Sequence, residues 1–403
     1  MNDACDLVDW IIRHATESQD LTALVEGLSL RLAALGVPLQ RLQVSMRSID
    51  PKHRGVAVTW TLGQGVVEEN TAHGNEETFQ RSPINLLLAA GKSEGRWNLS
   101  AGEGVDGLPI LADLERAGST DYVLRLVSFP SEAFIGGMAC SLATEAPGGF
   151  CDQHLRLVDM VLPAVGLAAY RFALTRTATE ALKVYVGPRT SARILAGQIR
   201  QGEGQAIYAA ILFADMKNFT GLNERYPPDR IVGWLNEQFE ALGAEIDRHG
   251  GEILKFMGDS VLAIFPVDNS LGAVNTACVQ ALAAAETGLA AVAALNAQRE
   301  GTDEPVIPID VVLHLGEVFY GNVGAARRLD FTVIGPVVNE ASRLEALCDG
   351  LGRNLLLSKV FADHCGVETE RLGTFELKGV KLPHTVYGIG KAAARNGERR
   401  RSD

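Results

Sequence analysis

The spacing of apolar residues predicts both helices and strands in the first half of the chain. Residues 4–35 carry apolar side chains three and four positions apart, the spacing of a helix that buries one face. A second helical pattern covers 152–183, where Pro163 either kinks the helix or begins a new one. Short apolar runs between polar turns predict strands at 43–47, 56–61, 122–129 and 136–143. This half therefore predicts a mixed α+β domain.

The second half alternates strand and helix patterns regularly from 209 to 390, and its first strand ends in a carboxylate. Residues 209–214 form an unbroken apolar run that leads to Asp215. Such a run predicts a buried central strand, which places Asp215 where the sheet meets solvent. The chain then turns toward a long amphipathic helix, and backbone N–H groups at this turn are suited to hold phosphates. Asp215 would hold a cation beside them.

Two further segments carry polar residues at turns. Apolar runs on either side of Gly258 and Asp259 predict a hairpin that presents Asp259 at its tip. Lys255 lies among apolar neighbours in the strand before it, and a buried ammonium is costly unless a partner or ligand compensates. After a strand that ends at 334, a helix begins and brings Asn339 and Arg343 to one face, since they are four residues apart. Each feature alone is common in ordinary folds, but together they indicate a site for a metal-bound nucleotide.

Composition restricts the class of protein. The chain has 403 residues, 47% hydrophobic and 21% charged, which predicts two to three globular domains. A formal net charge of −12 argues against non-specific binding to nucleic acid or an anionic membrane. Six cysteines without CxxC spacing are expected to be reduced thiols scattered in the core. No secretory signal is visible, and we expect no apolar stretch to approach the ~20 residues needed to span a bilayer, so we predict a cytoplasmic protein.

The first half resembles a GAF domain, a small-molecule sensor fold with an antiparallel sheet and flanking helices. The resembling stretches are AGSTDY at 117–122, FIGGM at 134–138, SLAT at 141–144 and PGGF at 147–150. The resemblance implies a GAF-like regulatory domain over 1–180 that binds a small-molecule effector. A helical linker at 181–204 and a basic tail at 392–403 would flank a catalytic domain at 205–391.

Residues 207–389 resemble the catalytic domain of class III nucleotidyl cyclases, an α+β fold of the ferredoxin-like, palm type. The motifs are FADMKNFT at 213–220, KFMGD at 255–259, VIGPVVNEASR at 333–343 and LKGV at 377–380. They occur in the family's order and spacing. Thr332 stands where many members have Asp, which resembles the class IIIb subgroup, some members of which respond to bicarbonate.

The resemblance implies a role for each matching residue. Asp215 and Asp259, assisted by the Met216 carbonyl, would hold two Mg²⁺ or Mn²⁺ ions. Lys255 and Thr332 would select adenine. The remaining assignments are Asn339 to the ribose, Arg343 to the transition state, Phe219 and Thr220 to the phosphate-binding turn, and Lys378 to the terminal phosphates.

These assignments predict an adenylate cyclase that makes 3′,5′-cyclic AMP and pyrophosphate from ATP. In the family, metal ligands of one subunit face the base and ribose residues of the other, so a homodimer with two equivalent sites is expected. The alternatives are a guanylate cyclase, which Lys255 disfavours, and a catalytically silent module that binds ATP as a regulator.

Overall fold

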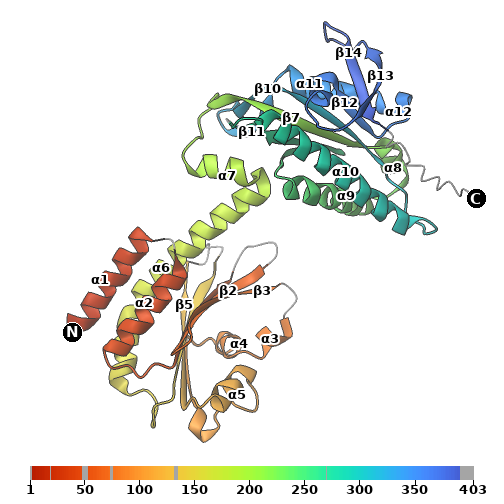
Figure 1. Ribbon diagram of the computed structural model, residues 1–403. Helices are drawn as coiled ribbons and strands as arrows, with labels where there is room; N and C mark the ends of the chain where they lie inside the picture. Colours follow the sequence, from red (N-terminus) through yellow and green to blue (C-terminus); the bar gives the residue numbers. More distant parts are fainter. Residues whose placement is uncertain are drawn as a thin grey trace, which may run out of the picture. The chain divides into compact units, whose positions relative to one another are not determined.

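The computed structural model describes residues 2–18, 20–47, 53–72, 76–130, 135–268 and 270–390. The chain divides into two compact units, 1–181 and 182–403 (Figure 1). The boundary falls inside helix α6, near the start of the helical linker expected at 181–204. The basic tail expected at 392–403 and Phe134 of the GAF-like pattern lie outside the described residues.

The first unit is a six-stranded antiparallel sheet with helices on both faces. Its strands follow the order β3-β2-β1-β6-β5-β4. The elements are α1 (Asn2–Glu17), α2 (Leu21–Ala34), β1 (Arg41–Arg47), β2 (His53–Thr61), β3 (Gly65–Ala72), α3 (Glu76–Gln80), α4 (Pro83–Ala89), β4 (Glu94–Asn98), the 3₁₀ turn η1 (Leu99–Ala101), α5 (Pro109–Arg116), β5 (Asp121–Ser128), β6 (Gly137–Thr144) and α6 (Asp152–Val186).

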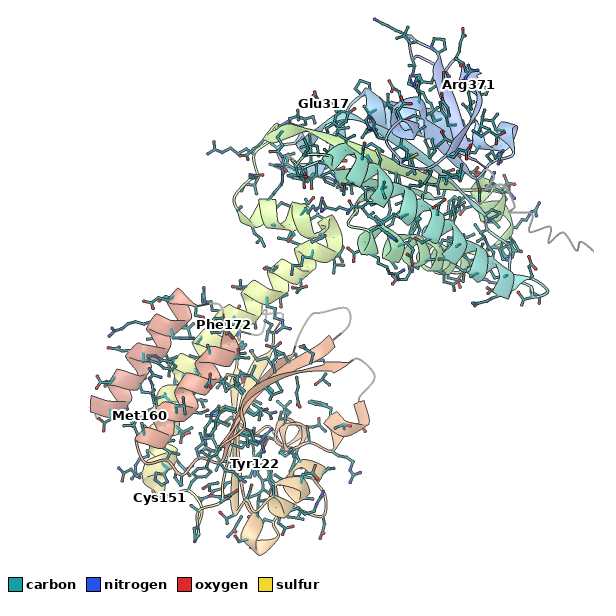
Figure 2. The ribbon with its side chains drawn as sticks, in the orientation of Figure 1. Tyr122, Cys151, Met160, Phe172, Glu317 and Arg371 are labelled. Carbon is teal, nitrogen blue, oxygen red and sulfur yellow. The ribbon has the colours of Figure 1, made fainter. Side chains whose placement is uncertain are left out.

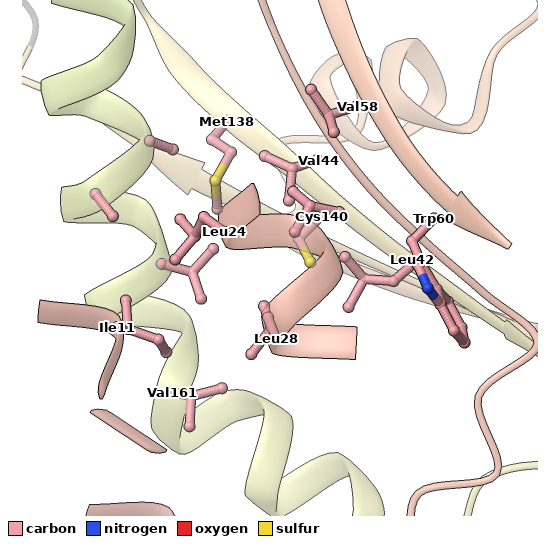
Figure 3. Packing of buried hydrophobic residues seen from close by; sticks show 14 of the residues in the cluster. Ile11, Leu24, Leu28, Leu42, Val44, Val58, Trp60, Met138, Cys140 and Val161 are labelled. Atoms are coloured by element: carbon pink, nitrogen blue, oxygen red, sulfur yellow. The ribbon is translucent and has the colours of Figure 1, made fainter. Parts of the chain in front are cut away.

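The main core of this unit lies between the sheet and helices α1, α2 and α6. Ile11 and Leu24 meet Val161 of α6 and Met138 of the sheet there (Figure 3). A smaller core under α4 and α5 includes Tyr122 on the opposite face. The arrangement agrees with the predicted mixed architecture, and the GAF-like assignment itself stays a prediction.

The helical region predicted over 4–35 consists of two helices rather than one. The break has a local cause, because the Asp20 side chain accepts hydrogen bonds from the backbone N–H groups of Thr22 and Ala23 and so begins α2. The helix from Asp152 continues through Pro163 to Val186, so the alternative of a new helix at the proline is excluded.

The second unit is built on an eight-stranded sheet. Seven strands follow the order β13-β14-β12-β10-β7-β9-β8, and β11 pairs with β10. The elements are α7 (Pro188–Leu195), β7 (Gly204–Met216), α8 (Phe219–Arg225), α9 (Pro228–Arg248), β8 (Glu252–Met257), β9 (Ser260–Pro266), α10 (Ala273–Arg299), β10 (Ile309–Ala325), β11 (Arg328–Ile334), α11 (Pro336–Glu345), α12 (Cys348–Leu351), β12 (Leu355–Ser358), α13 (Lys359–Ala362), β13 (Thr369–Phe375) and β14 (His384–Ile389).

Strand β7 is buried on both faces, as its unbroken apolar run predicts. Leu212 faces the core beneath α9 and α10, which lie side by side (Figure 1), whereas Phe213 faces the core beneath α11. The predicted hairpin is present: β8 and β9 are joined at Gly258 and Asp259, and Gly258 has a φ of 68°, a left-handed conformation that favours glycine. The sheet therefore holds the ends of β7 and of this hairpin in fixed positions.

Helix α7 is fastened to the edge strand of this sheet by Glu252. One carboxylate oxygen of Glu252 accepts the backbone N–H groups of Arg189 (3.1 Å) and Thr190 (3.2 Å), and the other accepts the hydroxyl of Tyr320 (3.3 Å). Burial raises the pKa of Glu252 above its ordinary value. Gly187 precedes the helix with a φ of 84°, and an added Cβ would lie 2.7 Å from the Glu252 carboxylate. The carboxylate therefore occupies the space that a side chain at Gly187 would need.

Two helices, α6 and α10, are long and apolar enough to cross a membrane by length and composition. The expectation that no stretch approaches this length was therefore wrong. Both helices contribute to protein cores, α6 through Val161 and Phe172 and α10 through Ala281 and Leu282. Packing accounts for part of their apolar character. The cytoplasmic location stays a prediction.

The cysteines are free but not all buried. Cys140, Cys278, Cys348 and Cys365 are buried, as expected, whereas Cys5 and Cys151 are exposed. Cys151 immediately precedes α6 (Figure 2). The expectation of core thiols was therefore wrong for these two.

Candidate active site

The two carboxylates singled out by sequence lie close together at one end of β7. Asp215 is the next-to-last residue of that strand and accepts a hydrogen bond from the hydroxyl of Ser260 at the start of β9. Asp259 occupies the hairpin tip beside Ser260. Burial raises the pKa of Asp259, and the charge of Asp215 raises it further. The two side chains therefore repel each other, an arrangement that a divalent cation between them would relieve.

Additional negative charge surrounds this pair. Burial, followed by the charges of Asp215, Asp310 and Asp349, raises the pKa of Glu345 to about 7. Lys217 offsets part of this charge because its ammonium lies 2.8 Å from Asp310 and also pairs with Asp349. One oxygen of the buried Asp310 has no hydrogen-bond partner among the described residues. Among the residues that the structure describes, no three or more acidic, histidine or cysteine side chains converge as a metal-binding group, so the site offers the two carboxylates of Asp215 and Asp259 in a negatively charged setting.

The turn after β7 carries three further predicted residues. Met216 ends the strand with a buried side chain, and Phe219 begins α8 with a side chain packed partly against the core beneath α9. Thr220 is exposed. Asn218 joins the two elements with a φ of 59°, a left-handed conformation uncommon outside glycine. The tight turn therefore leads the chain directly from the Asp215 carboxylate into helix α8.

Lys255, on β8, has the compensating partner that its position requires. Its ammonium pairs with the carboxylate of Asp330 on β11, and both side chains are partly exposed. Thr332 lies two residues further along β11 and so faces the same side of the strand. It is buried, with 8% of its surface exposed. A cavity of about 460 Å³ is lined by Lys255, Asp330 and residues of β8, α9 and the end of α6.

Helix α11 carries Asn339 and Arg343 with free side chains. Asn339 is exposed and Arg343 is partly buried. The loop that contains Lys378 passes beside Arg343, because a Cβ added to Gly379 would lie 3.6 Å from the Arg343 guanidinium. Within the part of the chain that the structure describes, the side chains of Asn339, Arg343 and Lys378 make no hydrogen bond or ion pair. All three are available to a ligand.

The candidate residues fall into separate groups along β7. Thr332 pairs with Gly321, which pairs with Gly204 at the beginning of β7. Asp215 lies at the other end, where it pairs with Asp310. Within one chain, Asp215 and Asp259 therefore lie close together, whereas Thr332 lies away from both.

Sequence reasoning missed the polar residues that hold the predicted ones. Asp330 pairs with Lys255, and Ser260 bonds Asp215. Asp330 could have been identified from the sequence, because it lies two residues before Thr332 and so shares one face of the strand with it. The contact itself joins β8 and β11, which are not neighbours in the sheet order, and no local pattern predicts it.

Residues 205–390 match the family model of the adenylate and guanylate cyclase catalytic domain. Among similar proteins, Adenylate cyclase 1 of Rhizobium meliloti is 32% identical over 182 residues, 44% of this chain and 27% of the relative. The adenylate cyclase of Anabaena cylindrica is 36% identical over 165 residues, 40% of this chain and 31% of the relative. The chain thus spans about a third of the length of these curated relatives.

Solved structures of similar proteins exist as well. The adenylyl cyclase CyaB from P. aeruginosa is 26% identical, with a TM-score of 0.43, and the similarity covers 48% of this chain and 98% of that one. The residues matched by the family model, 205–390, lie within the second unit.

Proposed function

We propose, from the premise that residues 205–390 form an adenylate and guanylate cyclase catalytic domain, that this protein converts ATP to 3′,5′-cyclic AMP and pyrophosphate. In this reaction the ribose 3′-oxygen bonds to the α-phosphorus, its proton leaves, and the bond from that phosphorus to the pyrophosphate breaks. The observation that carries the proposal is the meeting of Asp215 and Asp259 at the end of β7. Adenine preference rests on Lys255.

Asp215, Asp259 and the Met216 carbonyl would hold two Mg²⁺ or Mn²⁺ ions. The mutual repulsion of the carboxylates and the surrounding negative charge support this assignment. When bound, such ions lower the pKa of the 3′-hydroxyl and neutralise the triphosphate. The backbone N–H groups of the turn at Phe219 and Thr220 would orient the phosphates.

The free side chains near α11 are assigned to the sugar and phosphates. Asn339 would orient the ribose, because its amide can both donate to and accept from the ring oxygen and hydroxyl groups. Arg343 would stabilise the charge that develops on the α-phosphate, an effect typically worth about 10²–10³ in rate per donor. Lys378, in the loop beside Arg343, would contact the terminal phosphates.

Base selection follows from hydrogen-bond complementarity. The Lys255 ammonium would donate to N1 of adenine, while Thr332 would accept from the exocyclic amine. Guanine presents a donor at N1 and an acceptor at O6, so both contacts would be mismatched. Asp330 supports this role because its carboxylate pairs with the Lys255 ammonium and restricts its position.

The active form would be a homodimer with two equivalent sites. Because Thr332 and Asp215 align with opposite ends of β7 within one chain, a nucleotide would contact the metal ligands of one copy and the base-selecting residues of another. The first unit would act as a GAF-like sensor that changes how two copies meet when a small molecule binds. In that case an effector would change the rate of the full-length protein at saturating ATP.

The experiment that tests this function is an assay of the purified protein with ATP and with GTP, each with Mg²⁺ or Mn²⁺. The proposal predicts cyclic AMP and pyrophosphate in equal amounts from ATP. Faster turnover of GTP would identify a guanylate cyclase and refute the base-selection argument. ATP binding without pyrophosphate release would identify a silent regulator instead.

A further inference from the structure

A buried histidine connects strands β10 and β12 to helix α11, the helix that carries Asn339. His314 lies in the middle of β10, and only 5% of its side chain is exposed. Its Nδ1 lies 2.7 Å from the hydroxyl of Ser358, and its Nε2 lies 3.0 Å from a carboxylate oxygen of Glu340. Ser358 ends β12, and Glu340 belongs to α11. One imidazole therefore joins β10, β12 and α11.

The hydrogen bonds of this group assign the tautomer of His314. The Ser358 oxygen already accepts the backbone N–H of Phe361 at 3.3 Å, so its own proton is free to reach Nδ1. The Glu340 carboxylate can only accept, which requires a proton on Nε2. A neutral imidazole with hydrogen on Nε2 satisfies every partner, and burial lowers the pKa of His314 in favour of that neutral form. The chain of bonds thus runs from Phe361 through Ser358 and His314 to Glu340.

A second imidazole approaches the same carboxylate from β14. His384 Nε2 lies 3.9 Å from the Glu340 oxygen that His314 contacts. The two imidazole rings are 6.2 Å apart, at an angle of 74°. Glu340, about one fifth exposed, therefore faces histidines from two strands. The hydrogen bond between its carboxylate and His314 connects α11 to the sheet.

Helix α11, which Glu340 connects to the sheet, is short and packs on the sheet through apolar side chains. Helix α11 has ten residues, and no side chain caps its first turn. Ala341 and Leu344 are fully buried against the core on that side of the sheet. Apolar packing is not directional, so it leaves a helix freer to rotate or slide than a hydrogen bond does. The Glu340 carboxylate supplies a directional contact.

We propose that Glu340 and His314 are positioning residues that fix the rotation of α11 and so aim Asn339 and Arg343 at the nucleotide. Asn339 is the immediate neighbour of Glu340, and Arg343 lies one turn further along the helix. This inference rests on the proposed cyclase function. Catalytic groups displaced by about 1 Å lose roughly 10²-fold in rate, so a modest rotation of α11 is costly.

The test compares the full-length Glu340→Ala and Glu340→Gln variants with the wild type in a cyclic AMP assay. Glu340→Ala removes the hydrogen bond to His314, so kcat falls about 10- to 100-fold, while KM for ATP stays within about threefold. Glu340→Gln keeps an oxygen that accepts from His314 and recovers most of the lost rate. Ser342→Ala, an exposed residue on the same helix, serves as the control and keeps the wild-type kcat.

Melting temperatures are measured in parallel, with assays well below them, so that loss of folding is not read as loss of positioning. His314→Gln provides a second test from the β10 side and is expected to lower kcat in the same way. If Glu340→Ala has the kcat of the wild type, even with a lower melting temperature, the inference is overturned, and the contact between Glu340 and His314 serves stability alone. Equal loss in the Ala and Gln variants would overturn it too. A wild type that makes no cyclic AMP refutes the proposed function itself, a result distinct from both.

Discussion

Replacement of Lys255 by alanine tests the base-selection argument, and the structure provides the magnitudes. The Lys255 side chain is 35% exposed and its partner Asp330 is 47% exposed. An ion pair this open contributes about 0–1 kcal/mol to stability, because water screens it. For a unit of this size, 1 kcal/mol corresponds to a shift of about 2–4 °C in Tm. The variant should therefore fold and melt close to the wild type.

The effect on catalysis should be much larger than the effect on stability. A hydrogen bond from a charged donor is worth about 1.5–3 kcal/mol. Its loss lowers kcat/KM for ATP about 10- to 150-fold, since 1.36 kcal/mol is tenfold in rate. The value for GTP should not fall, because Lys255→Ala removes a mismatched donor. The ATP-to-GTP ratio of kcat/KM therefore decreases by at least the same factor.

The assay measures initial rates with both nucleotides, together with Tm. Lys359→Ala is a control, because Lys359 also pairs with an aspartate, Asp363, at 2.8 Å, and its side chain is more open to solvent than that of Lys255. It should leave both rates unchanged. An ATP kcat/KM within twofold of the wild type in Lys255→Ala, with an unchanged ratio, would refute the reasoning.

Three other variants test separate parts of the account. Asp259→Asn removes a proposed metal carboxylate, so turnover should nearly cease and Mn²⁺ binding measured by electron paramagnetic resonance should weaken; unchanged Mn²⁺ affinity would contradict the metal assignment. Arg343→Ala should lower kcat about 10²–10³-fold with less effect on KM, and a change confined to KM would argue against a transition-state role. Glu252→Gln tests the buried carboxylate behind α7: because the folded state raises the pKa of Glu252, wild-type stability falls as pH rises from about 4.5 through the folded value. The variant lacks this loss, so its Tm relative to the wild type should increase as pH rises above about 4.5, and a constant difference would count against the raised pKa.

The strands and helices of the second unit that carry candidate residues could be predicted because each has a strong local pattern. The apolar run before Asp215 and the glycine at the hairpin tip have simple physical meanings, and the structure contains both elements. Strands β3 and β4 were not predicted. Strand β3 is largely exposed and polar. Strand β4 alternates in exposure, but it has only five residues and one of its two less exposed positions is Gly95, so its pattern is weak.

The candidate site was only partly accessible to sequence reasoning. Catalytic residue types at turns can be found from spacing, but the groups that hold them come from distant parts of the chain. Asp330 reaches Lys255 across 75 residues, and His314 reaches Glu340 across 26. Such pairs depend on how β8, β10, β11 and α11 pack together, which is a property of the tertiary structure.

The most direct test of a shared two-chain site mixes two inactive variants. Asp215→Asn lacks a metal ligand, and Arg343→Ala lacks the proposed transition-state residue, which we assign, with Lys255 and Thr332, to the copy opposite the metal ligands. Each homodimer is therefore expected to be nearly inactive. In an equal mixture that exchanges subunits freely, half of the dimers are heterodimers, and each has one intact site. Cyclic AMP formation should then return to about a quarter of the wild-type rate. A mixture no more active than the two variants assayed separately, with heterodimers shown to form, would contradict the account.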